Sequence, residues 1–326
     1  MYGCLYTVNL QHTRLSTDQC TQMMNTSLTS TTLANLNLAG NNLSGVPAEL
    51  LATAVSHLHS VNLESTRLSI DQCTQIMNTS LTSTTLANLN LRWINLSGVL
   101  ADILAMAVSH LKIVRLTFIQ LTTNQSVKVL DIIPSSATLT NLDLWGNNLS
   151  GVPADILAMA VSHLKTVCLT FTQLTTNQSV KVLDIIPSSA TLTNLDLWGN
   201  NLSGVLAATM AMAVGRLKTV NLESTQLTIN QSVKVLDIIP SSATLNNLDL
   251  WGNNLSAVPA DILAMVVGRL ETVNLSYTQL TTNQCVKVLE SIPPTRLTNL
   301  YLYGIDLSGV PADLLAKNVG RLKIYN

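Results

Sequence analysis

The stretch LTNLDLWGNNL, residues 139–149, decides how this chain of 326 residues folds. With Leu139 counted as position 1, leucines at positions 1, 4 and 6 alternate with other residues, the pattern of a strand that buries one face. Pro153 follows where a helix can begin without losing a hydrogen bond. An apolar stripe with helical spacing then runs from Ile156 to Val161. The segment therefore predicts a strand followed by a helix.

The strand pattern Leu-x-x-(Leu/Val)-x-Leu recurs along nearly the whole chain. Successive starts are alternately 28 and 25 residues apart, a joint period of 53, except for one spacing of 27. Because one repeat cannot bury its own apolar face, repeats must stack, and we expect a single array over residues 1–326. The starts are Leu5, Leu33, Leu58, Leu86, Leu111, Leu139, Leu164, Leu192, Leu217, Leu245, Leu270 and Leu297, with a truncated repeat from Leu322.

The long repeats of 28 residues carry their own helix signals. In the repeat from Leu164, Thr175 and Gln178 have the spacing of a capping box. Val180, Leu183 and Ile186 are expected to form the apolar face of the helix that follows. Each long repeat is therefore also predicted to be a strand followed by a helix.

The motif Leu-x-x-Leu-x-Leu-x-x-Asn-x-Leu resembles the leucine-rich repeat, and the alternation of two repeat lengths resembles the ribonuclease-inhibitor-like subclass. The resemblance covers about residues 5–326. It implies an α/β solenoid, a horseshoe or arc, with one long parallel β-sheet on the concave face and helices on the convex face. It also implies a non-enzymatic, receptor-type module that binds a protein partner through the sheet.

In that family the asparagine at position 9 hydrogen-bonds the backbone of successive loops. The short repeats match it at Asn41, Asn147, Asn200 and Asn253. The long repeats carry a threonine there, which can still satisfy a backbone group. Isoleucine cannot, and predicts weaker loops at Ile94, Ile119 and Ile305.

Aromatic residues gather at the positions expected to look outward. With the leucines turned inward, positions 3, 5 and 7 face the open side of the sheet, and position 8 lies at its margin. Exposed aromatic residues are over-represented in binding hot spots, which favours an interaction surface, although copying of one ancestral repeat would produce the same row. The predicted surface comprises Trp93, Phe118, Asp143, Trp145, Phe171, Asp196, Trp198, Asp249, Trp251, Tyr277, Tyr301 and Tyr303.

Two further functions stay open. Residues 122–152 and 175–205 are identical, and such a repetitive surface suits a repetitive ligand or another copy of the chain. Head-to-tail stacking would give filaments, because a heterologous contact stays open unless it closes into a ring. It would use Leu5, Val8, Leu10, Leu322 and Ile324. Evenly spaced tryptophans beside Asn and Asp would instead suit a linear polysaccharide.

Composition excludes several classes of function. A net charge of −1 with only 11% charged residues gives no basic surface for nucleic acid. No run of about 18 apolar residues predicts insertion into a membrane. Equivalent residues such as His57, His110 and His163 would lie two strands, roughly 9.6 Å, apart, too far to share a metal ion. Since no catalytic set or phosphate loop stands out either, we expect no enzyme activity, metal or cofactor.

The signals for cellular location conflict. Cys20, Cys73 and Cys285 occupy equivalent helix positions too far apart for disulfides, which favours a reducing compartment such as the cytoplasm. Cys168 is expected to face outward. No signal peptide is visible at the start of the sequence. Asn-x-Ser sequons would instead suit a secreted protein, and five share one outward position at Asn42, Asn95, Asn148, Asn201 and Asn254.

Overall fold

The computed structural model describes residues 6–292, 296–319 and 323–325. The chain divides into two compact units, Met1–Val167 and Cys168–Asn326, which we call the N-terminal and C-terminal units. The N-terminal unit contains β1 (Tyr6–Asn9), α1 (Thr17–Thr29), β2 (Leu33–Asn37), α2 (Ala48–His57), β3 (Ser60–Asn62), α3 (Ile70–Ser80), β4 (Asn88–Asn90), α4 (Ala101–His110), β5 (Ile113–Arg115), α5 (Thr123–Ile132), β6 (Asn141–Asp143) and α6 (Ala154–His163). Strand β7 (Thr166–Cys168) contains the boundary.

The C-terminal unit repeats the same alternation. It contains α7 (Thr176–Ile185), β8 (Asn194–Asp196), α8 (Ala207–Arg216), β9 (Thr219–Asn221), α9 (Ile229–Ile238), β10 (Asn247–Asp249), α10 (Ala260–Arg269), β11 (Thr272–Asn274), α11 (Thr282–Ser291), β12 (Asn299–Tyr301), α12 (Ala312–Val319) and β13 (Lys323–Tyr325). Short 3-10 turns extend three of the long-repeat helices, at Ile133–Ser135, Ile186–Ser188 and Ile239–Ser241.

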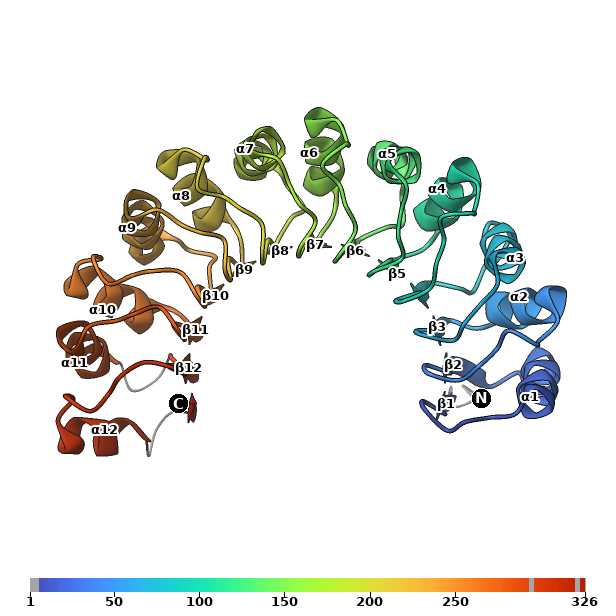
Figure 1. Cartoon of the computed structure of the whole chain (residues 1–326), viewed down its shortest axis with the longest axis horizontal. Helices are drawn as coiled ribbons and strands as arrows, with labels where there is room; N and C mark the ends of the chain where they lie inside the picture. The colour runs from blue at the N-terminus through green and yellow to red at the C-terminus, as the bar shows by residue number, and fades with distance from the viewer. Residues whose placement is uncertain (1–5, 293–295, 320–322, 326) are drawn as a thin grey trace. The chain divides into compact units, whose positions relative to one another are not determined.

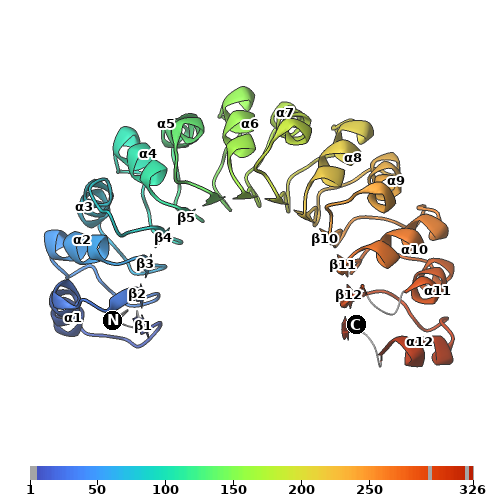
Figure 2. The ribbon, with the colours of Figure 1, turned by 180° about the vertical axis from the view of Figure 1, so that it is seen from behind.

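Each strand pairs in parallel with the next strand in sequence. The pairing joins β1 to β6 in the N-terminal unit and β8 to β13 in the C-terminal unit. The central residues stay in register, so that Leu36 pairs with Val61 and Val61 with Leu89. Within each unit the helices cover one face of the sheet and leave the other free of helices (Figures 1 and 2). The predicted α/β architecture of stacked strand–helix repeats is confirmed.

The core lies between sheet and helices and is almost wholly aliphatic. Leu142 and Leu144 of one short repeat are buried, as are Leu157 and Val161 of its helix. In the long repeat from Leu164 the predicted helix face is partly wrong: Val182, not Val180, is buried. The helix begins at Thr176 with its capping box in place, and this start turns Val182, Leu183 and Ile186 inward.

The position-9 asparagines tie neighbouring loops together as expected. Asn147 Nδ2 donates to the carbonyls of Leu116 at 2.6 Å and Leu144 at 3.0 Å, and its Oδ1 accepts from the Leu121 N–H at 3.2 Å. The threonine of the long repeats also satisfies a backbone group, since Thr66 Oγ1 donates to Leu63 O at 2.6 Å.

Ile94 takes the asparagine position in one short repeat and is fully buried. It offers no acceptor to Leu68 N–H, the counterpart of Leu121 N–H, and that amide has no hydrogen bond among the described residues. This orphaned amide gives a physical reason for the predicted weaker loop.

A buried glutamine in the long repeats has two roles. Gln125 completes the capping box of α5 with Thr122. Its Nε2 also donates to the carbonyls of Leu96 and Val99 in the preceding short repeat, both at 2.7 Å. The same pair of bonds to the preceding repeat is made by Gln72, Gln231 and Gln284.

Helix packing also differs between the two kinds of junction, from short to long repeat and from long to short repeat. A short-repeat helix packs more extensively on the helix of the following long repeat, as α4 does on α5, than a long-repeat helix packs on the next short one, as α5 does on α6. Interfaces of two strengths therefore alternate within each unit. No helix among the described residues has the length and apolar character needed to cross a bilayer.

Candidate functional site

Aromatic rings line one margin of the sheet face in both units. In the N-terminal unit Trp93 stacks on Phe118, with ring centroids 4.2 Å apart and planes 7° apart. Phe118 in turn contacts Trp145 at 5.3 Å with a 55° tilt. These three rings come from successive repeats and form a continuous row, which we call the N-terminal aromatic row.

The C-terminal unit carries two groups of rings, one of two and one of three. Phe171 and Trp198 lie 5.0 Å apart. Trp251 contacts Tyr277 edge-on at 5.3 Å, and Tyr277 contacts Tyr303 in the same way at 5.3 Å. These five residues are the C-terminal aromatic row. Position 8 of the repeat between Trp198 and Trp251 is serine, so no ring fills the gap there.

These rings are accessible, but unequally so. Trp93, Phe171, Tyr277 and Tyr303 keep between 43% and 56% of their surface exposed. The remaining aromatic members of the predicted surface are half-buried: Phe118, Trp145, Trp198, Trp251 and Tyr301. The face therefore presents large apolar groups held in place by their neighbours.

The three predicted aspartates have a structural task that the sequence analysis missed. Asp143 Oδ1 accepts a hydrogen bond from the backbone N–H of Trp145 at 3.0 Å, and Asp196 does the same for Trp198 at 3.0 Å. Asp249 Oδ1 accepts from Trp251 N–H at 2.9 Å. Asparagine makes the same turn elsewhere, as Asn221 does for Glu223 at 2.9 Å. The interchange of Asp and Asn at position 5 was the sequence signal for this role.

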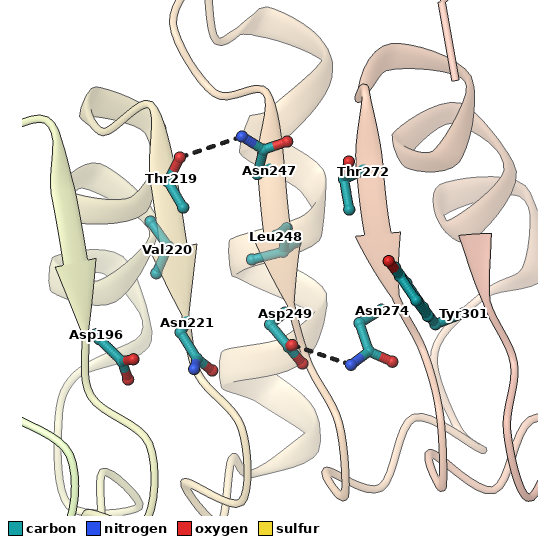
Figure 3. A pocket seen from close by; sticks show the side chains of 10 residues that line it. All are labelled: Asp196, Thr219, Val220, Asn221, Asn247, Leu248, Asp249, Thr272, Asn274 and Tyr301. Atoms are coloured by element: carbon teal, nitrogen blue, oxygen red, sulfur yellow. Dashed lines mark hydrogen bonds between the residues drawn. The ribbon is translucent and has the colours of Figure 1, made fainter. Parts of the chain in front are cut away.

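A hollow of about 430 Å³ lies on the sheet face of the C-terminal unit. Figure 3 shows its lining, with Asp196, Asn221, Asp249 and Asn274 in a row across four strands. Tyr301 lies at one side. Asn274 Nδ2 donates to Asp249 Oδ2 at 2.9 Å, so both carboxylate oxygens of Asp249 accept hydrogen bonds.

Glu223, at position 7 beside this hollow, has an unusual charge environment. Burial raises its pKa to about 7, and the carboxylates of Asp249 and then Asp196 contribute to the rise. Burial also raises the pKa of Asp249, against the lowering by its two hydrogen bonds. Glu223 was not singled out from the sequence, because its surroundings depend on which residues adjacent strands place beside it.

In the N-terminal unit, position 7 also carries a carboxylate, Glu64, and the chain itself supplies a cation to it, Arg92. The Arg92 guanidinium lies 3.9 Å from Glu64 Oε1. It also lies over the ring of Trp145, 4.6 Å from the centroid, and 5.9 Å from that of Trp93. Asn90 Nδ2 adds a contact with Glu64 Oε2 at 3.4 Å.

The histidines and cysteines form no site in the described part of the chain. No group of three His, Cys, Asp or Glu side chains there is arranged to hold a metal ion. His110 and His163 bond the carbonyls of Met106 and Met159 in the last turn of their helices, each at 2.8 Å, so their rings complete the helix ends.

The equivalent cysteines Cys20, Cys73 and Cys285 are free and wholly buried. Burial raises the pKa of Cys73 to about 12, which suppresses the reactive thiolate. Cys168 is half-buried, with its thiol donating to Thr170 Oγ1 at 3.3 Å. Its predicted outward orientation is therefore only partly correct.

The residues predicted for end-to-end contacts are described only in part. Leu5 and Leu322 lie outside the described residues, and Ile324 lies on β13. Val8, on β1, and Leu10, just after it, are half-buried. Their counterparts in the next repeat, Leu36 and Leu38, are fully buried.

Comparisons with known proteins agree with this arrangement. The model of the Leucine Rich Repeat family matches residues 138–159, the segment that sets the repeat pattern. A chain in the crystal structure of the Rad7 and Elc1 complex from yeast superimposes with a TM-score of 0.66 at 15% identity, covering 98% of this chain and 80% of that one. The leucine-rich repeat-containing protein LegL7 from Legionella pneumophila gives 0.51 at 18% identity, covering 92% and 88%.

The chain has the leucine-rich-repeat fold. No curated protein matches its sequence. In each unit of this leucine-rich-repeat chain, the sheet face that is free of helices carries aromatic rings, and in the C-terminal unit it also carries the hollow.

Proposed function

We propose that the chain is a non-enzymatic protein-binding module that contacts its partner through the sheet face. The observation that supports this most strongly is the pair of aromatic rows, in which Trp93, Phe171, Tyr277 and Tyr303 stay largely exposed. Exposed tryptophan and tyrosine side chains are the residues that most often dominate binding energy at protein interfaces. A solenoid also presents an extended surface suited to a large partner.

Ring-to-ring contacts make this surface well suited to binding. Trp93 is held by Phe118, and Tyr277 by both Trp251 and Tyr303. Side chains that are already ordered lose less conformational entropy when a partner binds, so more of the contact energy appears as affinity. The similar chain from the Rad7 and Elc1 complex was solved with a protein partner, which supports the same role here.

Alanine substitutions on the two faces test this proposal. Proteins captured from the native cell extract by the immobilised chain would be retested one by one against Trp93→Ala, Phe171→Ala and Tyr303→Ala. Each is expected to weaken binding roughly tenfold or more, since a hot-spot residue contributes about 2 kcal/mol or more. The matched controls are Met212→Ala and Met265→Ala, because these helix-side methionines are equally exposed, at 55% and 53%.

The result separates three functions. Loss of protein binding only with the sheet-face variants supports the proposal, and equal loss with the methionine variants contradicts it. Glycan-array binding that disappears with the same sheet-face variants, with no protein captured, would instead indicate a binder of repetitive polysaccharide.

Self-assembly is a second candidate, favoured by the identity of residues 122–152 and 175–205, because such a repetitive surface suits another copy of the chain. Val8 and Leu10 remain half-exposed at positions that bury Leu36 and Leu38 in the next repeat. Another copy stacked on β1 would cover them. Sedimentation should then show a mass that grows with concentration in the wild-type chain and stays monomeric in Val8→Lys. A monomer at every concentration in both chains excludes assembly through this strand.

We also propose that the two compact units continue one array of the ribonuclease-inhibitor-like subclass. The alternation of 28 and 25 residues runs unchanged across the boundary at residues 167 and 168, which falls inside strand β7. An array predicts that Leu142→Ala and Leu248→Ala shift one common unfolding transition. Two transitions, each moved by one variant, would instead show independent domains.

A further inference from the structure

In the N-terminal unit an arginine of the chain lies between a carboxylate and an indole ring of the same chain. Arg92 lies between Glu64, at 3.9 Å, and the Trp145 ring, at 4.6 Å from its centroid. All three residues occupy position 7 of their repeats, on the sheet face. The arrangement shows how this scaffold binds a guanidinium: one side pairs with a carboxylate and the flat face stacks on an indole.

The C-terminal unit has a carboxylate at the same position, with an indole in the repeat on each side of it and no arginine. Glu223 occupies position 7 of its repeat, as Glu64 does. The strands on either side place Trp198 and Trp251 at the same position, because β8, β9 and β10 pair in register. Trp251 therefore stands where the other unit has Arg92. A carboxylate flanked by two indoles is left without an internal cation.

A second difference between the two units makes the surroundings of Glu223 more negative than those of Glu64. Asn90, which contacts Glu64, has Asp249 as its counterpart beside Glu223. Glu223 and Asp249 form no ion pair within the described chain, and the sheet-facing positions 3, 5 and 7 from β8 to β12 carry no Lys or Arg. Burial raises the pKa of Glu223, and the neighbouring carboxylates of Asp249 and Asp196 add to the rise. The adjoining hollow of about 430 Å³ leaves room for an incoming side chain.

We propose that Glu223, Trp198 and Trp251 form a binding site for the guanidinium of an arginine on a protein partner. The proposal rests on the proposed function and names the chemistry of the contact. Arginine fits better than lysine, because a planar guanidinium pairs with a carboxylate through two N–H groups while it stacks on a ring. Asp249 and Asp196 add attraction from the edge of the hollow.

The indole N–H signals of the four tryptophans give a direct test, since each reports on its own ring. N-acetyl-arginine methylamide would be titrated into the chain at pH 8, where Glu223 is mostly ionised, and followed by proton–nitrogen correlation spectra. The signals are assigned with single Trp→Phe variants. The signals of Trp198 and Trp251 should move, whereas those of Trp93 and Trp145, already beside Arg92, should stay in place. The lysine analogue should bind more weakly, and the uncharged citrulline analogue should cause no shift.

Three variants test which groups hold the guanidinium. Glu223→Gln should weaken binding of the arginine probe about tenfold or more, as expected for loss of a hydrogen bond to a charged group. Glu64→Gln is the matched control in the other unit and should leave the affinity unchanged. Trp251→Arg copies the arrangement of Arg92 and should abolish the shift at Trp198. Circular dichroism of each variant checks that it is folded.

Three results would overturn the inference: equal shifts at all four indoles, equal shifts with citrulline, or an affinity that Glu223→Gln does not change. The proposed function fails separately. If captured partners depend on the aromatic rows but the arginine probe does not bind at Glu223, only this inference is wrong. If the probe binds as expected but captured partners ignore the sheet face, the guanidinium site stands and the proposed function is wrong.

Discussion

The ring of Phe118 occupies the space that a side chain at Gly146 would need. A Cβ atom on Gly146 would lie 2.3 Å from Phe118 Cε1, far inside van der Waals contact. Gly146 also has a φ of +73°, which favours glycine. Both residues occupy position 8 of adjacent repeats, and the sizes are reversed once in the chain, where Ser65 precedes Trp93. Large and small residues are therefore matched across these junctions, whereas two small residues, Ser224 and Gly252, meet at another.

We expect Gly146→Ala to destabilise the fold by about 3 kcal/mol. The alanine would have to adopt a left-handed backbone conformation, and its Cβ would clash with the Phe118 ring. Adding Phe118→Ser should relieve the clash, because Ser224 lies over Gly252 in the same way without a ring. The double variant should then keep only the cost of the left-handed alanine, about 1 kcal/mol. Urea unfolding of the wild-type chain and both variants measures this. A double variant no more stable than the single one would contradict the matching.

Removing an unpartnered buried hydroxyl should stabilise the chain. Ser126 is wholly buried, its Oγ has no hydrogen-bond partner among the described residues, and its equivalent in the preceding long repeat is Cys73. Ser126→Ala is expected to raise the free energy of unfolding by about 1 kcal/mol. Ser80 is the control: it is equally buried, but its Oγ donates to Met77 O at 2.7 Å, so Ser80→Ala should lower stability by about 1 kcal/mol. Thermal unfolding of both variants decides the sign.

The bonds between repeats should make Gln125 more important than a helix cap. Gln125→Ala removes the Nε2 donor from the buried carbonyls of Leu96 and Val99, and Leu96 O keeps its bond from the Val99 N–H at 2.9 Å; the expected cost is about 3 kcal/mol. Gln19 makes the same capping box with Ser16 and is exposed, so Gln19→Ala should cost only about 1 kcal/mol. Equal losses in denaturant unfolding would show that the bonds to the preceding repeat contribute nothing.

Glu223 should make stability fall as pH rises. Its pKa is raised from 4.5 to about 7 in the folded chain, so the folded state holds the proton more tightly than the unfolded state. Stability from this group is therefore lost between about pH 4.5 and 7 and stays constant above. Glu223→Gln should stabilise the chain more at pH 8 than at pH 5, as measured by urea midpoints. A gain that is the same at both pH values would show that this pKa is unshifted.

The repeat spacing predicts most of the fold, because each leucine, asparagine and capping box acts within a local pattern. Thr175 and Gln178 were placed correctly for that reason. Which side of a short helix is buried is harder to predict. The choice between Val180 and Val182 depends on the residue at which the helix begins, and a shift of one residue changes it. The charge environments of Arg92 and Glu223 were not predictable, because they depend on the residues that neighbouring strands contribute.

The alternation of tight and loose helix interfaces has a mechanical consequence. Each short repeat is bonded to the long repeat after it, through Gln125 and its equivalents, and more weakly to the one before. A chain stretched from its ends should give way first at the loose interfaces. Each event would then release a short–long pair of 53 residues, which adds roughly 180 Å of contour length. Under force the elementary step would be the pair, not the single repeat.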